Sequence, residues 1–149
     1  MKIQDIPEFV KQKLQDDPSS PLAPIDFIVN DYDSDLINRE VVDVLNARGI
    51  AVILYVFGSP GVSNFNVPVA VTASVIEVAV QRERFLGGQP GLRALGVVHE
   101  IISKIANTSA PRCGNKPLRL VERQPFERIA AESGRVQFDI RLLADASVS

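Results

Sequence analysis

The longest hydrophobic run in the chain extends from Val67 to Val80 and is followed at once by the charged segment Gln81–Arg84. β-Branched residues dominate the run, which is typical of strands. We therefore expect one long strand that ends near Phe85. Apolar residues on both faces of its first half indicate burial from both sides. The charged second half would extend past the core and contact a neighbouring subunit.

Three other segments place apolar residues at the spacing of an amphipathic helix. The first, about 5–16, begins with Asp5 as a candidate N-cap and Pro7 in the first turn. The second, 35–48, is followed by Gly49, which suits the left-handed conformation found after many helices. The third covers about 91–107.

Residues 17–24 hold three prolines, which remove backbone donors and fix φ, so we expect an irregular linker within the domain. Alternation of apolar and polar residues predicts a half-buried antiparallel strand over 135–143. A second strand, about 117–123, would pair with it around a turn near Glu132–Gly134. Two further strands are expected at 24–29 and 50–57.

These elements predict a single α+β domain over residues 1–149, with a C-terminal strand pair over about 117–144. Its mainly antiparallel sheet would pack against two to three helices and carry long strands or a hairpin at the edge. The length fits one domain with its own core. With 46% apolar residues, 23% charged residues and a net charge of −2, the chain has the composition of a folded protein.

Cysteine usage and hydropathy favour an intracellular protein outside the membrane. Cys113 is the only cysteine, so no internal disulfide can form. The N-terminus lacks the layout of a signal peptide. The longest apolar stretches are shorter than the ~20 residues of a membrane-spanning helix.

Charge is distributed unevenly along the chain. Residues 1–60 contain five basic and ten acidic side chains, and residues 61–149 contain eleven and eight, so the two halves carry −5 and +3. Such asymmetry can favour head-to-tail contact between copies. Two solvated surfaces would explain it equally well.

Side chains able to carry catalysis are few, and we expect no enzyme and no cofactor. His99 is the only histidine, and Glu100 beside it would point about a quarter turn away on the helix. A histidine at the helix surface is the interpretation we favour. The thiol of Cys113 has basic neighbours that could lower its pKa, but no motif supplies a catalytic partner.

Metal and phosphate motifs are incomplete. One histidine and one cysteine cannot build a zinc site. The segment Asn30–Asp35 resembles half a calcium loop but lacks the required glycine and glutamate, so we favour a turn and helix cap. The glycine groups Gly58–Gly61 and Gly87–Gly91 lack the residues of a phosphate loop or dinucleotide fingerprint and are interpreted as turns.

Arginines gather in the second half of the chain, where they could bind nucleic acid or form pairs at an interface. Nucleic-acid binding would need stacking aromatic residues on the same face, and only three phenylalanines are nearby. Pairing with carboxylates across strands or between subunits is the interpretation we favour.

Three runs, Ser74–Phe85, Gly91–Ile102 and Lys116–Arg123, resemble the phage tail-terminator family in the order and texture of their elements. The similarity is greatest to the Mu-type branch of contractile-tailed phages and covers about residues 65–145. In that family a strand with a polar end leads into a helix, and a strand pair completes the sheet. The helix expected at 35–48 is additional to the family's pattern.

The resemblance implies a structural virion protein of the tail or neck, assembled in the host cytoplasm. Copies would form a homohexameric ring that caps the tail tube and stops its polymerisation. Implied partners are the tail tube protein, possibly the sheath protein, and a neck or head-completion protein. Genomic DNA would pass through the lumen without specific binding, and the acidic half of the chain could line it.

Three exposed regions are candidates for the contacts of such a ring. We expect them at the polar end of the long strand, in the loop around 58–66 and at the tip of the C-terminal hairpin. The residues concerned are Arg82, Glu83 and Arg84; Asn64 and Phe65; and Glu132 and Arg135.

Two other classes of function stay open. Another head–tail connector, or a tail-completion, tube or baseplate component, would also assemble as a ring. A small cytoplasmic enzyme or ligand-binding domain would need a pocket, for which His99, Glu100 and Arg93 are the only visible basis.

Overall fold

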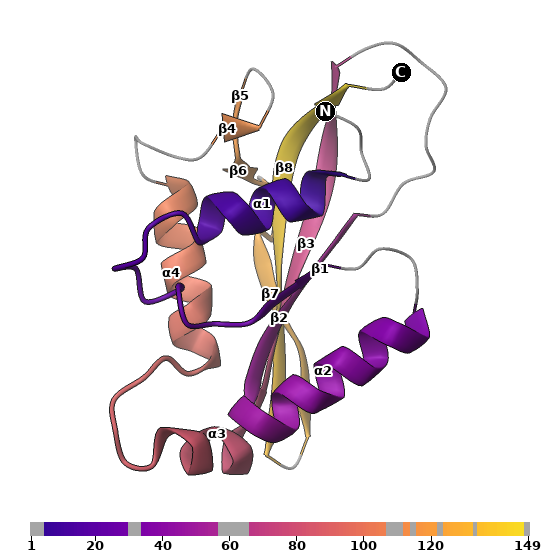
Figure 1. The fold of residues 1–149 in the computed structure, drawn as a ribbon. Coiled ribbons are helices and arrows are strands. Elements are labelled where there is room, and N and C mark those ends of the chain that lie inside the picture. Colours follow the sequence, from indigo (N-terminus) through magenta and orange to yellow (C-terminus); the bar gives the residue numbers. More distant parts are fainter. Residues whose placement is uncertain are drawn as a thin grey trace.

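The computed structural model describes residues 5–29, 34–56, 66–106, 112–113, 116–121, 124–132 and 134–147. Within these ranges a six-stranded sheet runs the length of the molecule, in the order β1-β2-β3-β8-β6, with β7 also paired to β8 (Figure 1). Only β1 and β2 are parallel. The strands are β1 (Phe27–Val29), β2 (Ile50–Val56), β3 (Asn66–Val78), β6 (Arg119–Leu120), β7 (Phe126–Glu132) and β8 (Arg135–Ser147).

Helices cover both faces of this sheet. α1 (Ile6–Leu14) and α4 (Ala94–Ala106) pack on one face, and α2 (Ser34–Arg48) packs on the other (Figure 1). α3 (Ala79–Leu86) follows β3 at the end of the sheet. A separate two-stranded ladder joins β4 (Arg112–Cys113) to β5 (Lys116–Pro117), so Cys113 lies in a short strand. The predicted α+β single domain is confirmed.

The period-2 pattern of the strands divides the core into two clusters. Val71, Val75 and Ile140 belong to the larger cluster under α1 and α4, while Ile76 belongs to the smaller cluster under α2. Neighbouring residues of a strand point to opposite faces, so one apolar run supplies both clusters. Burial from both sides is therefore confirmed for the part of β3 from Val71 to Glu77, whereas Val80, the last residue of the run, is exposed on α3.

The long strand predicted to end near Phe85 is corrected, because it ends at Val78 and α3 begins at Ala79. The ladder partners run out there: Ile50 of β2 pairs with Glu77, and Arg135 of β8 pairs with Val78. Without a neighbouring strand, the good helix formers among residues 81–86 adopt the local structure that they prefer.

The opposite end of β3 does extend past the rest of the sheet. Residues 66–69 pair only with residues 144–147 of β8, whereas β2 pairs with β3 from Val71 onwards. We call this two-stranded extension the β3–β8 ribbon. Figure 1 shows it at the end of the molecule opposite α3. β3 does extend beyond the other strands, as predicted, but it does so at the end opposite to the predicted one.

The C-terminal strand pairing also differs from the prediction. β8 runs alongside β7, which the sequence pattern did not indicate, and the expected strand 117–123 is reduced to the short β5 and β6. β6 and β7 follow one another along the same side of β8, with Gln124 in a left-handed conformation between them. The predicted turn is present, since Glu132 pairs with Arg135 and Gly134 has φ 76°.

Several other predictions can be placed. The helices expected at 5–16, 35–48 and 91–107 are α1, α2 and α4. Asp5 precedes α1 as predicted, but its side chain makes no capping hydrogen bond. Gly49 is left-handed with φ 77°, as predicted. Residues 17–24 form neither helix nor strand, yet Leu22 of this segment is buried in the core. The glycine-rich loop at 58–61 and most of the calcium-loop-like segment 30–35 lie outside the described residues.

No helix in the described ranges has the length and hydropathy needed to cross a membrane.

Candidate functional site

Two of the three predicted contact regions meet at one end of the molecule. The backbone N–H of Ala79, which opens α3, donates to the carbonyl of Gly134 in the β7–β8 turn at 2.7 Å. Glu83 and Arg84 are exposed on α3, and Arg135 is exposed at the start of β8. Glu132 pairs with Arg135 across the turn. Asn64 and Phe65, the third region, lie outside the described residues.

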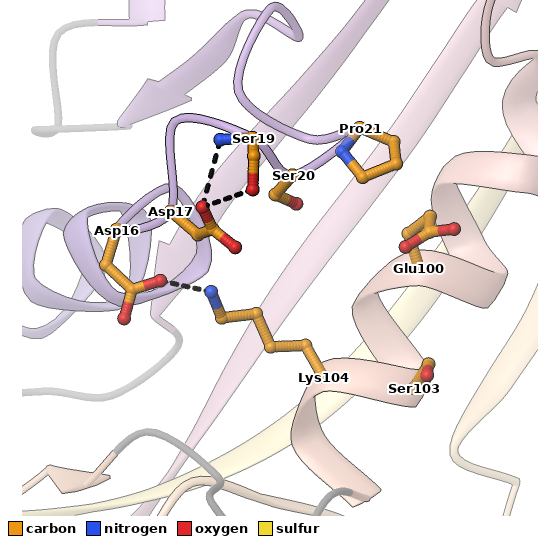
Figure 2. A pocket seen from close by; sticks show the side chains of 8 residues that line it. All are labelled: Asp16, Asp17, Ser19, Ser20, Pro21, Glu100, Ser103 and Lys104. Atoms are coloured by element: carbon orange, nitrogen blue, oxygen red, sulfur yellow. Dashed lines mark hydrogen bonds and ion pairs between the residues drawn. The ribbon is translucent and has the colours of Figure 1, made fainter.

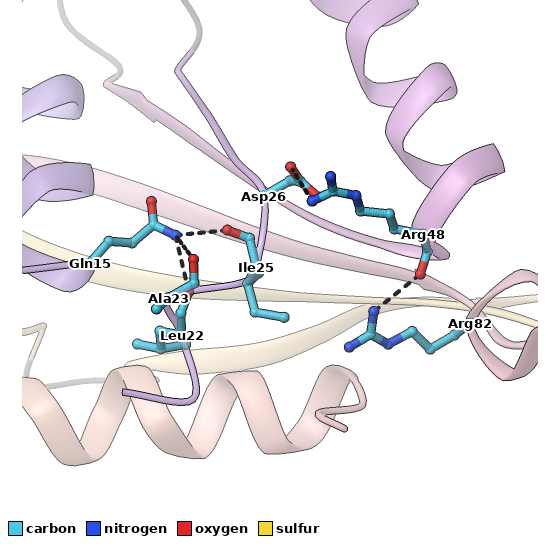
Figure 3. A network of polar contacts seen from close by, with 7 residues as sticks. All are labelled: Gln15, Leu22, Ala23, Ile25, Asp26, Arg48 and Arg82. Atoms are coloured by element: carbon cyan, nitrogen blue, oxygen red, sulfur yellow. Dashed lines mark hydrogen bonds and ion pairs between the residues drawn. The ribbon is translucent and has the colours of Figure 1, made fainter. Parts of the chain in front are cut away.

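Arg82, expected to be an exposed contact, is buried and only 5% exposed. Its Nε donates to the carbonyl of Leu92 at 2.9 Å. Figure 3 shows its second bond, in which Nη1 donates to the carbonyl of Arg48 at 3.2 Å. The expectation was wrong because α3 turns this side chain inward, towards the end of α2. Burial lowers the pKa of the guanidinium, and the charge of Glu77 opposes that effect.

An apolar groove of about 590 Å³ lies over Arg82, which forms part of its lining. We call it the Arg82 groove. Its walls come from three segments, namely the proline-rich connection after α1, α3, and the connection between α3 and α4. Phe85, half exposed, is its largest aromatic surface, and the Phe85 ring centroid lies 5.4 Å from the Arg82 guanidinium carbon. The lining residues are Pro21, Pro24, Ile25, Arg82, Phe85, Leu86, Pro90, Gly91 and Leu92.

A side-chain amide adds to the backbone bonds that hold the proline-rich wall of the groove in place. Gln15, just after α1, donates through Nε2 to the carbonyls of Leu22 at 3.0 Å and Ile25 at 2.7 Å (Figure 3). Prolines cannot supply backbone donors, and a side-chain amide takes over part of that role. The segment predicted to be a linker is therefore a fixed wall.

Arg82 forms no ion pair among the described residues, because no carboxylate there lies within 4.0 Å of it, although the more distant charge of Glu77 acts on it. Asp26, whose charge acts on Arg82 from further away, pairs with Arg48 at 3.1 Å (Figure 3). Buried charges are normally paired, since desolvation of an isolated ion is costly. The groove thus combines apolar walls with a buried cation that only backbone carbonyls satisfy.

Arg93, one of the three residues considered for a catalytic site, is already engaged. Its Nε donates to Glu77 Oε1 at 2.8 Å and its Nη2 to Oε2 at 3.2 Å, while the backbone N–H of Ala94 donates to the same Oε1 at 3.0 Å. The hydrogen bond to Glu77 raises the pKa of Arg93. His99 is exposed on α4. The three residues do not converge on one point.

Glu100 lines a separate polar depression of about 460 Å³ between the end of α1 and α4 (Figure 2). Lys104 of α4 forms an ion pair there with Asp16. The hydroxyl and backbone N–H of Ser19 hold the pKa of Asp17 below its ordinary value. No group of histidine, cysteine and carboxylate side chains suited to a metal ion occurs within the described ranges.

A polar network crosses the sheet on the face that carries α2. Ser74 Oγ donates to Asp139 Oδ1 at 2.7 Å, Gln137 Nε2 donates to the same oxygen at 3.1 Å, and the Tyr55 hydroxyl lies 3.3 Å from Ser74 Oγ. Next to it, Arg141 pairs with Glu127 at 2.6 Å. These groups, of which Ser74 is fully buried, satisfy one another. The expected pairing of arginines with carboxylates across strands is present at this ladder.

Neither models of known protein families nor curated proteins match this chain. The interpretation of its surfaces therefore depends on its own residues.

Sequence reasoning did not find the Arg82 groove. A signal for α3 was present, since helix formers at 81–86 precede Gly87, which is left-handed with φ 57° and ends the helix. Reading 81–86 as a helix would have moved Arg82 away from Glu83 and Arg84. No local sequence pattern indicates that the two proline-containing connections lie beside α3.

Proposed function

We propose that this protein is a structural virion subunit, the terminator that caps a phage tail tube as a ring, usually of six copies. The ring stops tube polymerisation and offers the surface to which the neck of the head attaches. Its partners are the tube protein below and a neck protein above, and the sheath protein is a further candidate partner. DNA passes through the ring without specific contacts.

The observation that carries this proposal is the β3–β8 ribbon. Its four residue pairs, from Asn66↔Ser147 to Val69↔Ala144, have no third strand beside them among the described residues. A two-stranded ladder is at best marginally stable alone in water, and its free edges can accept another strand. A subunit that must pair with a tube or with its neighbours needs such a feature, whereas a monomeric domain gains nothing from it.

The surface of the opposite end supports the same proposal. The charged residues Glu83, Arg84 and Arg135 are exposed together there, next to the β7–β8 turn. The two ends of the sheet thus offer different contacts, as a terminator requires when it binds the tube on one side and a neck protein on the other. Charged rim residues influence the rate and selectivity of association more than its affinity.

Mass in solution and negative-stain images of the purified protein test the proposal. We expect rings, and rings bound to the ends of tail tubes when tubes are added. A protein that is strictly monomeric, and remains so beside tubes, would contradict it. Rings found elsewhere in the particle, as located by labelling of assembled phage, would indicate another connector or baseplate component instead.

Charge reversal at the α3 end tests the second contact. We expect Glu83→Lys with Arg84→Glu and Arg135→Glu to leave the fold intact, because these side chains are exposed, and to slow attachment of the neck or tube at least about tenfold. Glu8→Lys, an exposed change on α1, is the matched control. Unchanged attachment, followed by sedimentation of tube–ring complexes, would exclude these residues as contacts.

A further inference from the structure

The Arg82 groove has the properties of a docking site for a carboxylate flanked by apolar atoms. Its lining includes Arg82, a residue that is 5% exposed and has no carboxylate within 4.0 Å among the described residues. Its rim carries the half-exposed ring of Phe85 and exposed prolines. A charge-assisted bond in such an apolar setting is stronger than one in water.

The surface of the chain itself offers a candidate segment on α2, where an apolar residue and a carboxylate follow one another and both are exposed. Six large apolar side chains are exposed among the described residues, and only Val42 and Phe126 have a carboxylate residue next to them in the sequence. Glu127, beside Phe126, is already paired with Arg141 at 2.6 Å. Asp43, beside Val42, is exposed and forms no ion pair with any described residue. The six are Val42, Val80, Phe85, Leu95, Phe126 and Ile129.

Val42 and Asp43 are exposed on α2, and the groove lies at the end of the sheet where Arg82 of α3 reaches the carbonyl of Arg48. α2 packs on the cluster that contains Ile76, whereas Ile25 and Leu92 of the groove pack with the cluster under α1 and α4. Two different and complementary surfaces of one subunit give head-to-tail contacts, which close into a ring when the rotation between copies permits.

We propose that copies of this chain associate by docking the α2 surface around Val42 and Asp43 into the Arg82 groove of the next copy. Val42 packs against Phe85, and Asp43 supplies the carboxylate that the buried guanidinium lacks. This contact is the lateral one between neighbours in the ring of the proposed function and rests on it. It is distinct from the contacts at the two ends of the sheet.

Cross-linking of mixed variants tests this contact directly. In a Cys113→Ser background, Val42→Cys and Phe85→Cys proteins are prepared separately, mixed to exchange subunits, and treated with a short bis-maleimide. We expect a covalent dimer from the mixture and none from either variant alone, because the contact joins two different surfaces. The matched control replaces Phe85→Cys with Val80→Cys, a more exposed residue of α3 that does not line the groove.

A charge variant adds an independent measurement. Asp43→Asn preserves the shape of the side chain and should weaken association between copies about tenfold or more in sedimentation equilibrium. Glu8→Gln, which removes an exposed carboxylate from α1, should leave association unchanged.

The outcomes separate this inference from the proposed function. Rings that form without the Val42–Phe85 cross-link overturn the contact and leave the terminator proposal standing. A cross-link in open oligomers that never bind tail tubes supports the contact and contradicts the terminator. Cross-linking of Val42→Cys with itself, or a protein that is monomeric throughout, overturns the contact.

Discussion

Two buried charged residues five positions apart, Glu77 and Arg82, have opposite kinds of surroundings. Glu77 is 6% exposed and receives three hydrogen bonds, two from Arg93 and one from the N–H of Ala94. Arg82 is 5% exposed and donates to two backbone carbonyls, with no carboxylate within 4.0 Å among the described residues. Glu77 thus has an ion-pair partner in the chain, whereas Arg82 feels only more distant carboxylates.

Because of this difference, we assign Glu77 to the stability of the fold and Arg82 to the proposed contact between copies. Glu77 caps the start of α4 and attaches it to β3, so its neutralisation belongs to the stability of the domain. Arg82 joins the end of α2 to the connection before α4, but its charge is left for another molecule. A paired buried charge should respond to mutation in the monomer, while an incomplete one should respond chiefly in the assembly.

The largest effect is expected from Gly49→Ala, which disturbs the site of Arg82 and leaves the pair of Glu77 intact. Gly49 has φ 77°, and a Cβ there would lie 2.1 Å from the backbone N of Arg82. Strain and overlap together should lower the free energy of unfolding by about 4 kcal/mol. Urea denaturation followed by circular dichroism measures it.

Gly87→Ala is the control for Gly49→Ala. It introduces the same left-handed strain, with φ 57°, where nothing lies within 4 Å of the new Cβ. A loss of about 1 kcal/mol is expected there. Equal losses at the two glycines would show that the close approach to Arg82 is unimportant.

An effect smaller than that of Gly49→Ala is expected from Glu77→Gln, which keeps the shape of the side chain but removes its charge. The start of α4 and Arg93 would lose their charged acceptor, at a cost of about 2 kcal/mol in monomer stability. Hydrogen exchange should increase first in α4. Association between copies, measured in the same samples, should not change beyond the effect of lower stability.

The smallest effect on the monomer is expected from Arg82→Met, because removal of an isolated buried cation offsets part of the lost bonding. The carbonyls of Leu92 and Arg48 lose their donor, yet no carboxylate is left behind, so we expect a loss of about 1 kcal/mol. Association between copies should fall by much more than for Glu77→Gln. If Arg82→Met lowers the free energy of unfolding of the monomer more than Glu77→Gln does, the distinction between the two residues is wrong.

Most of the helices and the main strands could be predicted from the chain alone, because their signals are local. Val136, Phe138, Ile140 and Leu142 alternate with polar residues in β8, and the apolar stripe of α4 repeats at helical spacing. Both patterns follow from the geometry of a single element. The left-handed Gly49 after α2 was predictable for the same reason.

The candidate site was less predictable, and Arg82 shows why. Residues 79–86 follow a strand with no break in the sequence, and their structure depends on where the neighbouring strands β2 and β8 stop. A strand over these residues would leave Arg82 exposed together with Glu83 and Arg84. In the helix that forms instead, Arg82 is buried and the other two are exposed. Strand β7 was missed because its residues pair with β8 through a register shift between Arg128 and Ala130 that breaks the alternation.

The sequence by itself determined the class of the fold, the two-sided burial of the middle of β3 and the positions of α1, α2 and α4, because hydrophobic periodicity and residues such as Gly49 act over a few neighbours. The tertiary structure decided where the long strand ends, which arginine is buried and which segments enclose the groove. These features depend on contacts between residues far apart in the chain, such as Arg82 with Arg48 and Leu92, for which no local pattern carries a signal.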